Sequence, residues 1–142
     1  MQKEQDRLYI NKENRVIFDK LKKDGLFKGL SNKDQFLFAM AIGFHNGKSF
    51  SPLSTKEGFF FVKDLQPEDR VLLEALVLAM NNNNINILED ASAIYKYAEE
   101  VANAGIKILE NKYNSVAFGS YEKSLEKELY DSLENFRNLE VK

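Results

Sequence analysis

Two segments of ten residues carry apolar side chains on almost every side of a helical projection, and they constrain the fold more than any other feature of the chain. They are residues 35–44 and residues 71–80. A helix that is apolar all round must be covered by other elements on most of its sides. Ten residues are also too few to cross the roughly 30 Å of hydrocarbon in a bilayer. We therefore expect 71–80 to pack against 35–44 as the buried centre of one folded domain.

Helix-start and helix-end signals surround both segments. Ser31 stands three residues before Asp34, which resembles a capping box, and the turn at residues 46–47 follows the first segment. Pro67 fits the first turn of the second helix. The asparagine run 81–84 then ends that helix, because short amides bond to the local backbone. These signals give each central helix a beginning and an end.

Three further amphipathic stretches complete the expected fold. Residues 12–24 predict a surface helix that Gly25 ends in a left-handed turn. Residues 89–113 predict a long helix whose small residues permit the close approach of a neighbour. Residues 120–142 predict a C-terminal amphipathic helix, and residues 1–10 are expected to fray. The stripe of that last helix is Tyr121, Leu125, Leu129, Leu133 and Phe136. We expect an all-α fold: a single domain over residues 1–142, built as a bundle of about five helices with two buried central helices.

The connection over residues 47–66 is the longest irregular stretch, and it contains the strand-prone run Phe59-Phe60-Phe61-Val62. A lone short strand has no obvious partner here. The sequence leaves three interpretations open: a hairpin, an extended segment lying over the core, or a minor two-stranded element near residues 47–63. Long loops of this kind often carry function.

The chain has no cysteine and one histidine, His45. A Cys/His zinc site and a thiol nucleophile are therefore excluded, and a Ser-His-Asp triad is excluded anywhere except around His45. The run Gly43–Ser49 has three residues between its glycines where a phosphate-binding loop requires four, and it closes a helix rather than opening one. We assign no catalytic residue, metal or cofactor, and an enzyme is the least favoured class of function.

Acidic and aromatic clusters have structural interpretations. Adjacent residues on a helix point about 100° apart, so they do not converge on one substrate atom. We interpret Glu89-Asp90 as helix-start chemistry and Glu99-Glu100 as part of a solvated face. Six aromatic residues in the second half of the connection and in the long helix have too few basic neighbours to favour stacking on single-stranded bases. We interpret them as core residues. They are Tyr95, Tyr97, Tyr113, Phe59, Phe60 and Phe61.

Charge narrows the class of partner. Twenty Lys and Arg residues against 22 Asp and Glu residues give a net charge of −2, which argues against duplex binding as the main activity. The polar N-terminus lacks the apolar run of a secretory signal, and we expect a cytoplasmic protein that does not enter a membrane.

The best candidate for a binding surface is the polar and basic perimeter of the 46–70 connection, because loops anchored between rigid helices commonly carry binding residues. We expect a protein partner there or on the last helix, which is also expected to support a homodimer. The alternative is a nucleic-acid-binding or nucleotide-binding regulator that uses the basic residues of the same connection. The candidate binding residues are His45, Lys48, Lys56, Glu57, Lys63 and Arg70.

Four runs of residues carry a family resemblance. They are Lys33–Gly47, Lys56–Phe60, Leu65–Asp69 and Ala98–Ile106. Together they resemble the small accessory proteins encoded beside bacterial DNA phosphorothioation (Dnd) modification and restriction systems, over about residues 10–115. The resemblance implies a cytoplasmic helper in a DNA-modification or anti-phage setting that acts through larger protein partners. It implies no catalytic residue.

Overall fold

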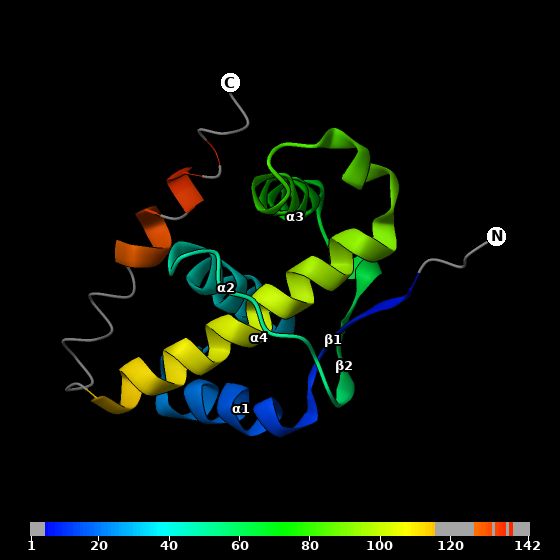
Figure 1. Cartoon of the computed structure of the whole chain (residues 1–142). Coiled ribbons are helices and arrows are strands. Elements are labelled where there is room, and N and C mark those ends of the chain that lie inside the picture. The colour runs from blue at the N-terminus through cyan, green and yellow to red at the C-terminus, as the bar shows by residue number, and fades with distance from the viewer. Residues whose placement is uncertain (1–4, 116–126, 132, 136, 138–142) are drawn as a thin grey trace.

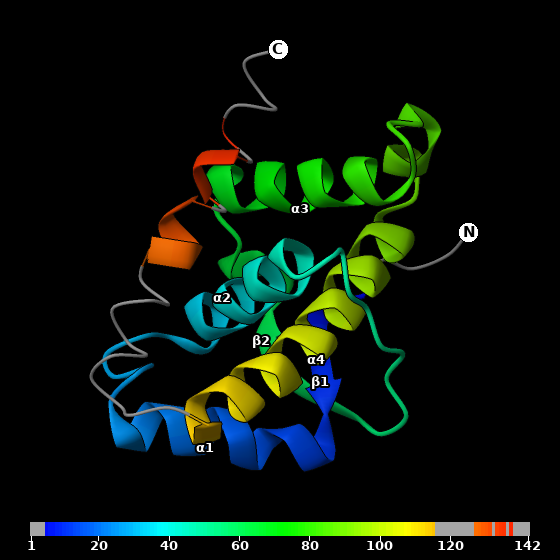
Figure 2. The same ribbon diagram turned by 60° about the vertical axis from the view of Figure 1, so that its left-hand side comes forward.

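The computed structural model describes residues 5–115, 127–131, 133–135 and 137. These residues form helices together with a small two-stranded antiparallel sheet, which confirms the all-helical fold class and the minor two-stranded element. Figures 1 and 2 show α1 and α3 at opposite ends of the molecule, with α2 and α4 between them. In chain order the elements are β1 Arg7–Asn11, α1 Arg15–Asp24, α2 Asn32–His45, β2 Lys56–Phe61, α3 Pro67–Met80 and α4 Ala91–Ser115, with 3-10 turns at Lys12–Asn14, Val62–Asp64 and Ile85–Glu89.

The centre of the fold is the crossing of α2 and α4, where two glycines let the helix backbones touch. A Cβ atom built on Gly105 would lie 1.7 Å from the carbonyl oxygen of Ala39, and one built on Gly43 would lie 2.3 Å from the carbonyl oxygen of Val101. Both distances are far inside van der Waals contact. The small residues expected along the long helix therefore do bring a neighbour close, and that neighbour is α2.

The expectation that 71–80 packs against 35–44 as a second buried central helix is corrected by this crossing, since the principal partner of α2 is α4 and α3 buries one side only. The physical reason is side-chain size, because the glycine seam lets α2 and α4 approach more closely than the leucines of α3 permit. α3 still contributes Leu73, Leu76 and Val77 to the core.

The sheet joins the N-terminus to the middle of the chain. β1 pairs antiparallel with β2, with Arg7 opposite Phe61 and Asn11 opposite Lys56. The expectation that residues 1–10 fray is wrong for Arg7 to Ile10, because Leu8 and Ile10 are buried in the core. Residues 1–4 lie outside the described part of the chain. A sheet partner more than 40 positions away leaves no local sequence signal, which is why the sequence does not predict β1.

The expected helix ends are confirmed at atomic detail. Gly25 ends α1 in the left-handed region with a φ of 112°. The Ser31 hydroxyl accepts a hydrogen bond from the Asp34 amide at 3.2 Å. Asn82 and Asn83 have positive φ where the asparagine run ends α3. The Asp90 carboxylate accepts from the Ser92 amide at 3.0 Å, so Asp90 begins α4 as expected.

The C-terminal amphipathic helix expected over 120–142 falls partly outside the described residues. The described residues 127–131, 133–135 and 137 are helical. Leu129 packs against the core. Tyr121, Leu125 and Phe136 of the predicted stripe lie outside the described residues.

Candidate functional site

Residues 46–55 connect α2 to β2 and lie along α4. We name them the Phe50 loop. Buried amides hold the middle of this loop. Asn103 of α4 donates from Nδ2 to the carbonyl oxygens of Ser51 at 2.9 Å and Pro52 at 3.4 Å. Its Oδ1 accepts from Nδ2 of the buried Asn14. The Ser51 amide donates to the Glu100 carbonyl at 2.9 Å. The loop is therefore joined to the backbone of α4 as well as to a side chain on it.

A second group of hydrogen bonds holds the end of the loop. The buried Asn11 accepts at Oδ1 from the Ser54 amide at 2.8 Å and the Thr55 amide at 3.1 Å. The Lys12 amide donates to the Thr55 carbonyl at 2.8 Å, and the Thr55 hydroxyl donates to Glu13 at 2.6 Å. That hydrogen bond lowers the pKa of Glu13 below its ordinary value. These hydrogen bonds to buried amides restrain the end of the loop.

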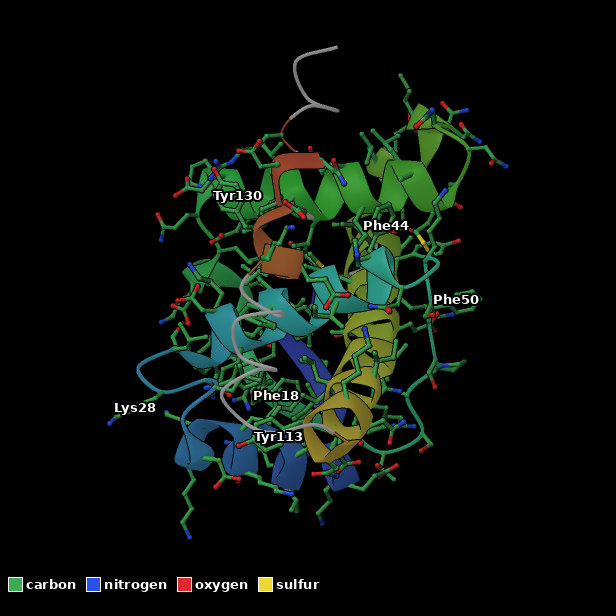
Figure 3. The ribbon with its side chains drawn as sticks, turned by 90° about the vertical axis from the view of Figure 1, so that its left-hand side faces the viewer. Phe18, Lys28, Phe44, Phe50, Tyr113 and Tyr130 are labelled. Atoms are coloured by element: carbon green, nitrogen blue, oxygen red, sulfur yellow. The ribbon has the colours of Figure 1, made fainter. Side chains whose placement is uncertain are left out.

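The loop presents one large apolar side chain to solvent. Phe50 is 59% exposed, and Figure 3 shows it at the edge of the molecule, on the chain segment that runs beside α4. The residues before it are also held, since the Ser49 amide donates to the Gly43 carbonyl at 2.9 Å and the Ser49 hydroxyl donates to the Asn46 carbonyl at 2.7 Å. The loop is therefore restrained by hydrogen bonds on both sides of an exposed phenylalanine.

The six residues predicted to bind a partner do not form one cluster. His45 and Lys48 lie together at the end of α2, where they line a shared hollow with Asn135. The Lys48 ammonium donates to the Ala79 carbonyl at 3.4 Å. His45 Nε2 lies 3.6 Å from Oε1 of Glu128.

The other four predicted residues lie farther along the chain. Lys56 and Glu57 begin β2 directly after the loop, and the Glu57 carboxylate pairs with Arg15 of α1 at 3.3 Å. Lys63 and Arg70 lie past the opposite end of β2. Arg70 donates from Nη1 to the Tyr95 hydroxyl at 3.3 Å.

Phe61 is the one exposed member of the aromatic run. It is 42% exposed, whereas Phe59 and Phe60 are buried as expected. The Arg7 guanidinium lies 4.9 Å and the Lys63 ammonium 5.3 Å from the centre of the Phe61 ring. This places two cations against a partly exposed aromatic ring.

Sequence reasoning missed the buried asparagines that build the site, Asn11, Asn14 and Asn103. Asn103 is flanked by alanines in the apolar part of a helix, and an amide in that position is the signal that was available.

The interpretation of Glu99 as part of a solvated face is wrong. The residue is only 4% exposed, because it sits on the face of α4 that β1 covers. It accepts hydrogen bonds from the Tyr9 amide at 2.9 Å and from Gln5 at 3.1 Å. Burial outweighs these bonds and raises the pKa of Glu99 above its ordinary value.

Searches with protein-family models, against curated proteins and against solved structures give no match for this chain. Within the described residues, none of the helices combines the length and the apolar character needed to span a bilayer. The same part of the chain contains no cluster of three His, Cys, Asp or Glu residues arranged to hold a metal ion.

Proposed function

We propose that this protein is a non-catalytic interaction protein that binds a protein partner through the Phe50 loop. The observation that carries the proposal is the contrast within the loop, whose backbone is fixed by buried asparagines while Phe50 is left exposed. A partner that buries this ring meets a loop that is already ordered, so little conformational entropy is lost on binding.

The charged residues in and beside the Phe50 loop favour a protein partner over a nucleic acid. Lys48 lies within the loop, and Lys56 and Glu57 follow it directly in the sequence. The Glu100 backbone carbonyl accepts from the Ser51 amide in the middle of the loop. An aromatic anchor surrounded by charges of both signs is typical of a protein interface with an apolar centre and a polar rim.

The resemblance to Dnd accessory proteins supplies the proposed setting. We place the protein in the cytoplasm beside components of a DNA phosphorothioation or restriction system, which are its proposed partners. This part of the proposal depends on the four sequence runs that carry the resemblance.

The test is co-purification of the full chain with each protein encoded by the neighbouring genes, followed by titration of any complex. Phe50→Ser is expected to weaken the complex at least about thirtyfold, the effect of losing a hot-spot side chain worth about 2 kcal/mol. Val16→Ser is the matched control, because Val16 is a similarly isolated apolar residue, 70% exposed on α1. Equal affinities of the two variants would refute the assignment of the loop.

A second candidate function, binding of single-stranded nucleic acid, is favoured by Phe61 and its two cations. A base can stack on the exposed ring while Arg7 and Lys63 neutralise phosphates. A labelled oligonucleotide would then bind with a log-log salt slope of about −1.4 for two phosphate contacts. Phe61→Ala would weaken binding about fivefold or more. Absence of binding at low salt eliminates this candidate.

A further inference from the structure

A small hollow lies between the first half of α3 and the beginning of α4. Its volume is about 150 Å³, and its lining has an apolar part and a polar part. The apolar part is formed by Leu73, Leu88, Ala91 and Ile94. The polar part is formed by Arg70, Glu74 and Tyr95. An aliphatic cavity of about this volume holds a molecule of the size of benzene, so the apolar part has room for a branched aliphatic side chain.

Arg70 presents its guanidinium to the polar part of the hollow. Nη1 donates to the Tyr95 hydroxyl at 3.3 Å, and Nη2 donates to the Val62 carbonyl at 3.5 Å. Both distances exceed the roughly 2.9 Å of a well-formed N–H···O hydrogen bond, and a guanidinium has further N–H donors. These two contacts therefore direct the guanidinium towards α4 without using its full capacity to donate.

Glu74 brings the opposite charge to the same hollow. It follows Arg70 by one helical turn, a spacing at which oppositely charged side chains commonly pair. Among the described residues, however, no ion pair joins the two side chains, because the Arg70 guanidinium is directed to Tyr95 and Val62 instead. The hollow therefore offers a separate cation and a separate anion beside an apolar recess.

We propose that this hollow binds a free aliphatic α-amino acid of the size of valine or leucine. Arg70 binds the α-carboxylate, Glu74 binds the α-ammonium, and the branched side chain enters the recess above the buried Leu73 and Ile94. The ligand is a zwitterion because a simple acid leaves Glu74 without a partner and a simple amine leaves Arg70 without one. A peptide does not fit, since none of its residues carries both charges. The hollow shares no lining residue with the Phe50 loop, so this proposal does not depend on the function of that loop.

Ligand analogues test the site in the unaltered full chain. Calorimetric titration with L-leucine is expected to give a Kd of about 0.1–1 mM, which is typical for a ligand of so few atoms. N-acetyl-leucine lacks the ammonium and isoamylamine lacks the carboxylate, and each should bind about tenfold more weakly. Glycine lacks the apolar side chain and should lose at least about tenfold. Failure of L-leucine to bind, or binding no tighter than that of any one of these analogues, would overturn the proposal.

Two pairs of variants locate the binding in this hollow. Ala91→Leu fills the recess and should weaken L-leucine binding at least about tenfold, whereas Ala93→Leu adds the same group outside the hollow. Glu74→Gln should weaken binding about tenfold, and Glu68→Gln makes the same change at an exposed position of α3 outside the hollow. Circular dichroism establishes that each variant is folded before it is titrated. Equal Kd values within either pair would show that L-leucine binds elsewhere and would overturn the assignment of the site.

Discussion

Replacing Gly105 with alanine tests the α2–α4 crossing, because two physical effects of the substitution have opposite signs. Alanine in place of glycine within a helix normally stabilises it by about 1 kcal/mol. At this position the new Cβ would lie 1.7 Å from the Ala39 carbonyl oxygen and 2.9 Å from the Gly43 nitrogen. Those atoms are backbone, so the clash is relieved only by separating the two helices.

The magnitude follows from these two terms. Overpacking of a well-packed core costs about 1–3 kcal/mol, and a backbone contact places Gly105→Ala at the upper end of that range. After subtraction of the helix-propensity gain, the free energy of unfolding should fall by about 2 kcal/mol. A chain of this size has about 7–20 kcal/mol in total, so the variant still folds, with a Tm lower by roughly 4–8 °C.

Urea unfolding followed by circular dichroism measures this change. Asn111→Ala is the control, since Asn111 is exposed on the same helix and should gain up to about 0.7 kcal/mol from propensity alone. If Gly105→Ala proves as stable as the natural chain or more so, the helices do not cross at this glycine and the packing argument fails.

Two further predictions concern the buried polar groups. Asn103→Ala removes the hydrogen bonds to the Ser51 and Pro52 carbonyls and takes the Oδ1 partner from the Asn14 amide, so we expect a loss of about 3 kcal/mol. Amide hydrogen exchange should become faster at Ser51, whose amide donates to the Glu100 carbonyl; unchanged exchange there would contradict the role of Asn103 in holding the loop. Glu99→Gln tests a pH dependence. Because burial raises the pKa of Glu99 above 4.5, the folded state keeps the proton longer than the unfolded state, and the free energy of unfolding falls as the pH rises from 4.5 through the raised pKa. A glutamine side chain cannot ionise, so the variant should gain stability relative to the natural chain as the pH rises through the raised pKa of Glu99, and identical pH profiles of unfolding would refute this.

Sequence reasoning was most accurate where short-range chemistry decides the structure. Gly25, Ser31, Pro67 and Asp90 act on residues within one helical turn, so their effects are visible in a short window. The fold class followed from the two apolar segments, because a helix that is apolar on most sides needs other elements to cover it; the pattern overstated the burial of 71–80, where Leu73, Leu76 and Val77 are the buried residues.

Pairings between distant residues could not be predicted in this way. Nothing in the sequence near Leu8 indicates a strand, since its partner Phe60 is far along the chain and a strand of five residues carries little periodicity. Glu99 was assigned to a solvated face because a carboxylate is ordinarily exposed. Its burial depends on β1, which covers that face of α4 only after the sheet has formed. The candidate binding residues stay a prediction, and the structure divides them between the end of α2, the start of β2 and the segment after β2; the asparagines that hold the loop were not identified.

Asn46 connects the Phe50 loop with the C-terminal helix. It is the first residue of the loop, and its backbone carbonyl accepts a hydrogen bond from the Ser49 hydroxyl. Its side-chain oxygen accepts from the Lys112 ammonium at 3.2 Å, and Lys112 in turn pairs with Glu128 of the C-terminal helix. A change in the seating of that helix therefore acts on Lys112, and through Lys112 on the residue where the loop begins. Because a continuous set of contacts can carry energetic coupling, the end of α2 is the place where the seating of the C-terminal helix and binding at Phe50 can influence each other.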